Sequence, residues 1–477
     1  MTEAKFLPGG PQVQLARGSE TPALSVSDVM DSRPLGRFQT ATILLCSLVI
    51  IFDGFDTQSI GLLAPSMSES LNIPLKYFGT ILSAALFGLM IASLVMGPVA
   101  DRWGRKWALV LSVLTFAFFM MLTARATSFQ ALLILRFLTG LGLGGAIPNA
   151  VALACEYAPK RLVPTVVGCI MAGMPLGQVL SGRAAAYLLP TRLGWRGVFY
   201  LGGILPILVA IALILWLPES VRFLTVRGGD KRKIAAILGR ISPDLAELNI
   251  RPDHSQDREQ KGLSVKHLFA EGRTAATLLL WVPFFMNLLI LYFIVSWLPA
   301  MLREVHMPIS AGVTAATVFG LGSIPGSIAQ GPLTDRVGSY ASLLSEFALC
   351  VVLCASLGWV ATSLRLVLAV AFVLGFTVTG IQAGLNSLSA SYYPTSIRST
   401  GVGWALGIGR IGSVTGPILG GILLKIGWTP QQILAATSVP ALCAGLAIVA
   451  SYHLTGNSSA YRPASVDSSA DVPVVSH

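Results

Sequence analysis

Long apolar segments recur along the whole chain and are separated by short polar connections. Each segment has about 20 residues or more, which is the length that an α-helix needs to cross the hydrocarbon core of a bilayer. We therefore predict an all-α membrane protein with twelve transmembrane helices. The segments fall at residues 40–63, 77–99, 107–124, 129–154, 163–189, 197–217, 275–300, 312–333, 340–361, 363–390, 400–424 and 430–453.

One long hydrophilic stretch divides the twelve segments into two groups of six. We predict a tail at 1–38, a six-helix half at 39–218, a linker at 219–273, a second six-helix half at 274–454 and a tail at 455–477. Lys and Arg concentrate in the tails, the linker and the connections of one side, which the positive-inside rule assigns to the cytoplasm. Both termini should then be cytoplasmic. The polar first tail lacks the apolar core of a cleaved signal peptide, so the first helix should serve as the insertion signal.

Composition excludes several classes of protein. Of the 477 residues, 54% are hydrophobic and only 12% are charged, whereas a soluble domain carries about 25% charged residues. The net charge of +11 lies in short connections without interleaved aromatic residues, so we do not expect nucleic-acid binding. The six cysteines are scattered through apolar segments with no metal-ligand spacing. No phosphate-binding loop and no nucleophile–base pattern is present, so we expect neither an enzyme nor a bound cofactor.

The two halves repeat each other in sequence. The stretch Gly97-Pro-Val-Ala-Asp-Arg-Trp-Gly104 returns 234 residues later as Gly331-Pro-Leu-Thr-Asp-Arg-Val-Gly338, and a Gly-Trp pair at Gly194 returns at Gly427. Each copy falls on the same helix of its half. Parallel repeats of this kind are related by an axis along the membrane normal. We therefore predict two pseudo-symmetric six-helix halves of the same orientation.

The repeated stretch carries charged residues at the cytoplasmic ends of helices. Because their spacing is copied between the halves, we interpret them as ion pairs that close an inner gate and break when the molecule opens inward. The alternative is that their positive charge only orients the helices. The predicted gate residues are Asp101, Arg102, Glu156, Arg161, Asp335, Arg336 and Arg398.

Several motifs resemble those of the major facilitator superfamily. The loop from Gly97 to Lys106 resembles its signature loop, and the run Arg-Phe-Leu-Thr-Gly that begins at Arg136 resembles its fourth-helix motif. The pattern Asp53-Gly-Phe-Asp56 is similar to that of the aromatic acid:proton symporters, which are bacterial uptake carriers. The resemblance implies the major facilitator fold and a monomer of the bacterial inner membrane. It also implies proton-driven uptake of a small aromatic carboxylate, with the proton as coupling ion and no other cofactor.

Asp53 and Asp56 are three residues apart and share one face of the first helix. A carboxylate at bilayer depth is costly unless it is neutralised or paired, so it is a functional candidate by default. Burial and mutual repulsion both favour the protonated form of one of the two. We predict that this pair carries the transported proton. The alternative is a structural pair satisfied by an arginine or by backbone N–H groups.

Three arginines lie within apolar segments and are candidates to bind an organic anion, because the guanidinium forms a bidentate contact with a carboxylate. Arg136 either binds substrate or pairs with a first-helix aspartate, and the two roles are compatible. Arg410 is the candidate in the second half, with helix packing as its alternative. Arg183 departs from the family pattern; if it faces the cavity, it should hold a second polar group of the ligand.

Polar and aromatic residues of the second half complete the predicted substrate site. Gln382 and Asn386 are four residues apart on one helix face, and Tyr292 and Trp404 are able to stack on an aromatic ring. Aromatic residues in membrane helices also serve as packing or interfacial groups.

Other functions remain open at this level. A carrier for a non-aromatic organic anion or an exporter fits the same pattern. A membrane sensor would need a further signalling domain, which the short tails and the linker do not provide.

Overall fold

The computed structural model describes residues 35–226, 231–241, 268–270, 272–360, 363–393 and 397–456. Most of the two tails and most of the linker expected at 219–273 lie outside these residues. Within them, twelve helices are long and apolar enough to cross a membrane, which confirms the predicted count. In chain order these spans are α2 (Arg37–Leu71), α3 (Phe78–Trp103), α4 (Arg105–Thr123), α5 with α6 (Phe129–Leu143, Ala146–Glu156), α7 with α8 (Val163–Met171, Gly173–Leu188), α9 (Gly194–Trp216), α12 (Thr274–Glu304), α13 (Ile309–Val337), α14 (Ser339–Val360), α15 (Leu364–Tyr392), α16 (Arg398–Lys425) and α17 with α18 (Pro430–Ala436, Ser438–Gly456).

Three spans consist of two helical segments where the sequence predicted one helix. The break between α5 and α6 falls at Gly144 and Gly145. A Cβ atom at Gly144 would collide with the backbone oxygen of Leu89 on α3, and one at Gly145 would collide with Ser112 on α4. The glycines therefore let three helices approach closely, as small residues do in membrane proteins.

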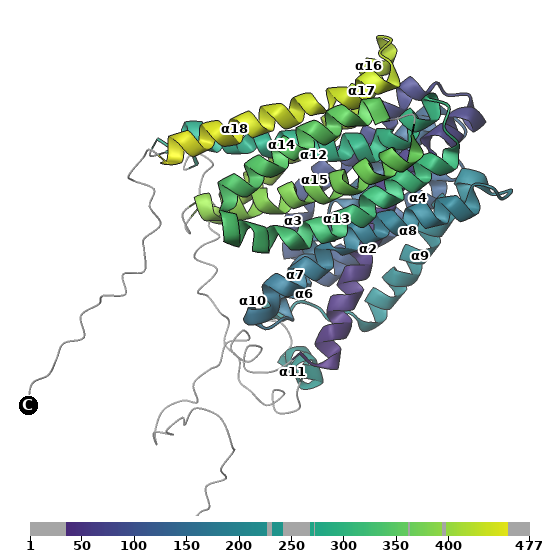
Figure 1. The fold of residues 1–477 in the computed structure, drawn as a ribbon. Coiled ribbons are helices and arrows are strands. Elements are labelled where there is room, and N and C mark those ends of the chain that lie inside the picture. Colours follow the sequence, from purple (N-terminus) through teal and green to yellow (C-terminus); the bar gives the residue numbers. More distant parts are fainter. Residues whose placement is uncertain are drawn as a thin grey trace, which may run out of the picture.

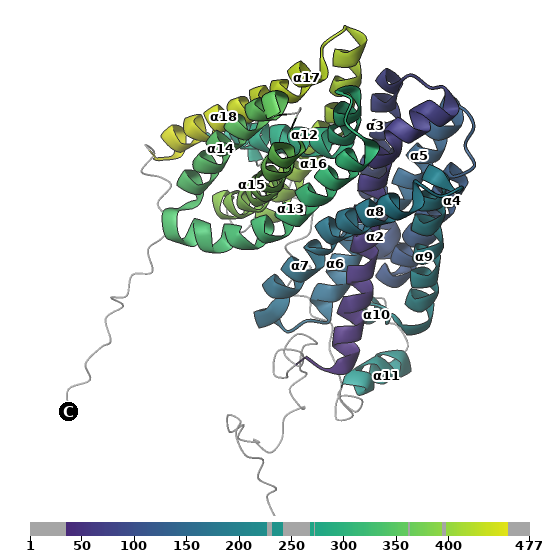
Figure 2. The same cartoon turned by 45° about the vertical axis from the view of Figure 1, so that its right-hand side comes forward.

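The helices form two bundles that lie side by side (Figures 1 and 2). The first bundle contains α2 to α9 and the second contains α12 to α18. The bundles meet where α3 packs on α16, α8 on α13 and α2 on α12. Two short helices, α10 (Val221–Val226) and α11 (Lys231–Ile241), follow the first bundle. We call the side with Arg37 and Gly456, where the chain ends emerge, the terminal side and the opposite side the far side.

The two bundles are joined tightly near the far side. Ser83 Oγ on α3 donates a 2.7 Å hydrogen bond to the backbone oxygen of Val414 on α16. Gly61 on α2 lies against the backbone of Val295 on α12, where a Cβ atom would come within 2.6 Å of the Val295 oxygen. These contacts close the far side of the molecule.

The same helix faces lose their partners toward the terminal side. Leu94 lies eleven residues beyond Ser83 and Ile328 eleven residues beyond Thr317, which in each case is about three helical turns along the same face. Thr317 still contacts the position of Gly182 on α8, but Leu94 is 77% exposed and Ile328 is 66% exposed. Figure 2 shows the two bundles diverging in this direction. The space between the halves therefore opens at the terminal side.

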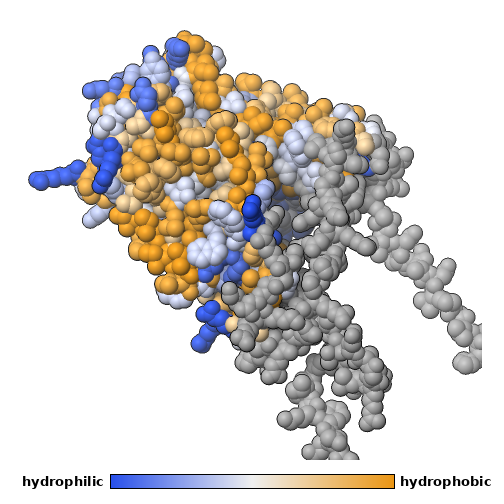
Figure 3. Space-filling model, turned by 180° about the vertical axis from the view of Figure 1, so that it is seen from behind, coloured by the Kyte–Doolittle hydropathy of each residue, from blue (hydrophilic) through white to orange (hydrophobic). Residues whose placement is uncertain are grey.

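Hydrophobic residues cover most of the molecular surface in Figure 3, and hydrophilic residues gather near its two ends. Large apolar side chains such as Phe118, Leu208 and Trp359 are exposed along the spans. A surface of this kind is stable only against lipid. The chain is a multi-pass membrane protein.

Candidate functional site

The first candidate pair lies in the middle of α2. Asp53 is fully buried and Asp56 is 1% exposed. The intervening Gly54 brings α2 against α8, because a Cβ atom there would collide with the backbone oxygen of Met174. This close approach removes water from the α2–α8 contact next to the two carboxylates.

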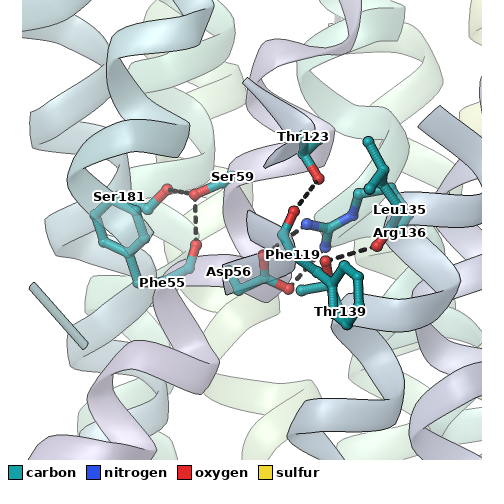
Figure 4. Close-up of polar contacts among 9 residues, drawn as sticks. All are labelled: Phe55, Asp56, Ser59, Phe119, Thr123, Leu135, Arg136, Thr139 and Ser181. Atoms are coloured by element: carbon teal, nitrogen blue, oxygen red, sulfur yellow. Dashed lines mark hydrogen bonds and ion pairs between the residues drawn. The ribbon is translucent and has the colours of Figure 1, made fainter. Parts of the chain in front are cut away.

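Asp56 and Arg136 form a two-fold hydrogen-bonded ion pair between α2 and α5 (Figure 4). Arg136 donates from Nη1 to Asp56 Oδ1 and from Nη2 to Asp56 Oδ2, both at 2.7 Å. Both side chains are 1% exposed, and the guanidinium carbon lies 5.9 Å from the ring centre of Phe199. The neighbouring Thr139 donates to the backbone oxygen of Leu135 and not to the pair. Of the two roles predicted for Arg136, this geometry shows the pairing with a first-helix aspartate.

Asp53 has a different environment from Asp56. Neither of its carboxylate oxygens has a hydrogen-bond partner among the described residues. Its strongest charge interactions are with Arg410 on α16 and with Asp56. Arg410 also interacts with the hydroxyl-bearing side chain of Tyr292 on α12. The fold therefore brings Asp53, Arg410 and Tyr292 together across the boundary between the two bundles.

A cavity of about 340 Å³ lies beside this group. Its polar lining comes from Asp56, Arg136, Tyr292 and Ser296. The rest of the lining is mainly aliphatic and comes largely from α3 and neighbouring turns: Ile60, Leu82, Ala85, Leu86, Leu89 and Leu143, together with Thr57. An apolar wall with a few converging polar groups is typical of a site for a small organic molecule.

The second half contributes a chain of amides. Asn287 on α12 donates from Nδ2 to Gln382 Oε1 at 3.0 Å and to the backbone oxygen of Val378 at 3.3 Å. Gln382 in turn donates to Asn386 Oδ1 at 3.4 Å. The predicted pair on α15 is thus part of a larger cluster. Sequence reasoning missed Asn287, although the repeat offset of 234 residues maps Asp53 onto it.

Two predicted substrate residues are not part of this site. Arg183 is exposed and shares a helix stripe with Leu180 (45% exposed) and Tyr187 (78% exposed). The prediction that it binds substrate is wrong, because this stripe faces away from the packed helices and the long side chain reaches the nearby end of α8. Trp404 is 42% exposed and stacks on Trp281 with ring centres 6.1 Å apart. It serves packing near the terminal end of α16, so its predicted role at the substrate ring is also wrong.

The predicted gate residues lie at the terminal ends of their helices. Arg105, not Arg102, pairs with Glu156, at 3.4 Å and within the first bundle. Arg398 Nε donates to the backbone oxygen of Tyr393 at 3.4 Å. Because the bundles diverge here, these contacts stay within one half. Arg102, Arg161, Asp335 and Arg336 are exposed, and the side chain of Asp101 lies outside the described part of the structure.

Glu219 connects the end of the first bundle to the signature loop. Its Oε1 accepts hydrogen bonds from the backbone N–H of Lys106 at 3.0 Å and of Ser220 at 2.9 Å, and its backbone oxygen accepts from Tyr157 Oη at 2.6 Å. Burial raises the pKa of the Glu219 carboxyl, although the backbone donors act in the opposite direction. The carboxylate caps the first turn of α4, where negative charge is favoured.

Comparison with known proteins identifies the family. The model of the Major Facilitator Superfamily matches residues 46–370 and 314–470. The chain belongs to this superfamily. The carrier is 36% identical over 438 residues to the 4-hydroxybenzoate transporter PcaK of Pseudomonas putida, covering 91% of this chain and 97% of that protein. It is 36% identical to a gallate transporter of the same organism, with 90% and 95% covered, and 31% identical to a benzoate transport protein of Acinetobacter baylyi, with 88% and 91% covered.

Solved structures agree on the fold. The xylose transporter XylE of E. coli in its inward open conformation superposes on the carrier with a TM-score of 0.69 and 16% identity, covering 87% of this chain and 96% of that one. The resemblance to aromatic acid carriers and the predicted twelve-helix fold are therefore confirmed, and the protein is a carrier and not an enzyme.

Proposed function

We propose that this carrier imports an aromatic carboxylate together with protons. Its relatives are named as transporters of 4-hydroxybenzoate, gallate and benzoate. The observation that carries the proposal is the placement of Arg410, from the second half, beside the buried and unpartnered carboxylate of Asp53, from the first half.

The two bundles supply different parts of the chemistry. Arg136 is already held by both oxygens of Asp56, so it has little capacity left for a substrate anion. Arg410 is partly exposed, and among the described residues it forms no direct ion pair with a carboxylate. Together with the Tyr292 hydroxyl it offers the substrate carboxylate a charged donor and a neutral one. The aliphatic lining of the cavity suits the ring.

Proton coupling follows from the charges. When Asp53 is ionised, it attracts Arg410 and competes with the substrate anion for it. A proton on Asp53 removes this competition and also the cost of a bare carboxylate in the membrane. Proton and anion therefore strengthen each other's binding, as thermodynamic reciprocity requires. A carrier with this property moves both together.

The same proposal assigns the terminal side to the cytoplasm, by the excess of Lys and Arg in the connections of that side. The opening between the bundles then faces inward, and the packed far side faces outward. We assign the carrier to the bacterial inner membrane, as a monomer with both termini cytoplasmic. No cofactor other than the coupling proton and no nucleic-acid partner is part of the proposal.

The test is uptake of radiolabelled benzoate and 4-hydroxybenzoate into proteoliposomes with an imposed pH gradient. Accumulation should rise as the external pH falls and collapse with a protonophore. Asp53→Asn should abolish accumulation but preserve exchange of substrate across the membrane without a gradient, because exchange does not require release of the proton.

Glu304→Gln provides the matched control, since it removes an exposed carboxyl at the far end of α12. This variant should accumulate substrate like the wild type. Accumulation that ignores the pH gradient would contradict proton coupling, and gradient-driven extrusion would make the protein an exporter. Absence of transport of every aromatic acid, with transport of another anion, would overturn the substrate class.

A further inference from the structure

Asn287 has one polar atom that the protein does not satisfy. The residue is fully buried, and both contacts of its amide use Nδ2 as donor. Its Oδ1 has no hydrogen-bond partner among the described residues. A buried acceptor without a partner costs about 1–3 kcal/mol, so such an atom in the core of a carrier calls for a ligand.

The orientation of the Asn287 amide follows from its neighbours. The backbone oxygen of Val378 is able only to accept hydrogen bonds, so the NH₂ group must face it. The oxygen of Asn287 therefore points away from α15. The next amide, Gln382, uses its oxygen to accept from Asn287 and its nitrogen to donate to Asn386. The chain of amides thus locks Asn287 with its acceptor free.

The position of Asn287 sets it apart from the anion site. It is five residues before Tyr292 on α12, which is about 7.5 Å along the axis and about 140° around it. A rigid ring with substituents at opposite ends is able to span this separation. In the first half the equivalent position is Asp53, and no charge is present at Asn287 itself.

We propose that Asn287 Oδ1 accepts a hydrogen bond from a hydroxyl group on the substrate ring, opposite the carboxylate held by Arg410 and Tyr292. This inference rests on the proposed function and narrows its substrate class to hydroxylated aromatic acids. A phenol is neutral at pH 7 and remains a donor there. A site built for a hydroxyl discriminates strongly against an analogue without one, because its own buried polar atom is then left unpaired.

The experiment measures inhibition constants of benzoate, 4-hydroxybenzoate and 4-methoxybenzoate against uptake of radiolabelled 4-hydroxybenzoate in proteoliposomes. The wild type should bind 4-hydroxybenzoate at least about tenfold more tightly than benzoate. The methyl ether has similar polarity but no donor, so it should gain nothing over benzoate. This comparison uses the wild-type protein and does not depend on the stability of a variant.

Asn287→Leu should remove the tenfold preference while changing the inhibition constant of benzoate by no more than about twofold. The control is Thr277→Val on the same helix, whose hydroxyl bonds the backbone oxygen of Leu268 and which should leave the preference intact. Equal binding of benzoate and 4-hydroxybenzoate by the wild type, or equal weakening of both by Asn287→Leu, would overturn the inference and leave the proposed function standing. Failure of all three acids to inhibit would overturn the proposed function as well.

Discussion

Arg136 and Arg410 illustrate how partners decide the role of a residue. Both are arginines within apolar helices and both were candidates to bind the substrate anion. Arg136 is enclosed by a two-fold contact with Asp56, whereas Arg410 stands beside a carboxylate that lacks hydrogen bonds. The first arginine therefore holds the first bundle together, and the second is left to respond to protons and anions.

The Asp56–Arg136 pair gives a prediction about stability. Asp56→Asn leaves a buried guanidinium without a counter-ion, which should cost about 3–5 kcal/mol. We expect a clearly lower unfolding temperature in a thermal-shift measurement in detergent. The double variant Asp56→Asn with Arg136→Gln should recover much of the loss, because no unpaired charge remains. A double variant as unstable as the sum of both single variants would show that the pair is not the cause.

Glu219 gives a prediction about pH. Burial raises the pKa of its carboxyl, so the folded state favours the protonated form more than the unfolded state does. The resulting stability is present below the ordinary value of 4.5 and is lost as the pH rises through the raised value. Glu219→Gln keeps an acceptor for the N–H groups of Lys106 and Ser220 but does not titrate. The unfolding temperature of this variant should therefore fall less than that of the wild type as the pH rises above 4.5. An identical pH profile would contradict this assignment.

At the scale of helices, glycines decide how closely the elements approach. Gly54 and Gly177 join α2 to α8 within one bundle, while Gly61 and Gly79 form contacts between the bundles at the far side. The contacts within a bundle are permanent. The contacts between bundles must break in every cycle if the far side is to open, so a side chain placed there should change the conformation and not the fold.

Gly61→Val tests this distinction. Its side chain would collide with the backbone of Val295 and Ser296, so the far side should no longer close. We expect a cysteine at Ser83, which is 3% exposed, to react with a membrane-impermeant maleimide in the variant and to stay protected otherwise. Gly403→Val is the control, since nothing lies within 4 Å of the added Cβ. Equal protection in both variants would contradict the role of Gly61.

For the whole molecule, the repeat explains where the outer closure lies. Glu69 and Arg303 occupy equivalent positions of the two halves, 234 residues apart, and form a 3.1 Å ion pair between α2 and α12 at the far side. Their side chains are 58% and 42% exposed, so the pair contributes about 0.2–1 kcal/mol. A contribution of this size biases the two conformations without locking one of them.

Glu69→Gln should accordingly shift the balance toward the outward-open form by no more than about fivefold. The shift is measurable by electron-spin distances between labels at Leu94→Cys and Ile328→Cys, after replacement of the exposed Cys169 and Cys443 by serine. The exchanged pair Glu69→Arg with Arg303→Glu should restore the wild-type distribution. A distribution unchanged in the single variant would remove the pair from the closure.

The sequence by itself determined the elements and the family. Twelve apolar segments of spanning length leave the backbone no stable alternative to helices in a bilayer, and the copied motif at 97–104 and 331–338 fixed two parallel halves. The carboxylates at Asp53 and Asp56 were also identifiable, because a charge at bilayer depth is rare without a function.

Only the tertiary structure decided which charges meet. Periodicity gives the face of a helix but not the neighbour that this face contacts, so it did not separate Arg136, paired with Asp56, from Arg183, which lies on an exposed stripe. Asn287 stayed hidden because an isolated amide in an apolar run carries no signal until its partners on α15 are in place. The opening toward the terminal side depends on how two rigid bundles lean on each other, and no local pattern encodes that angle.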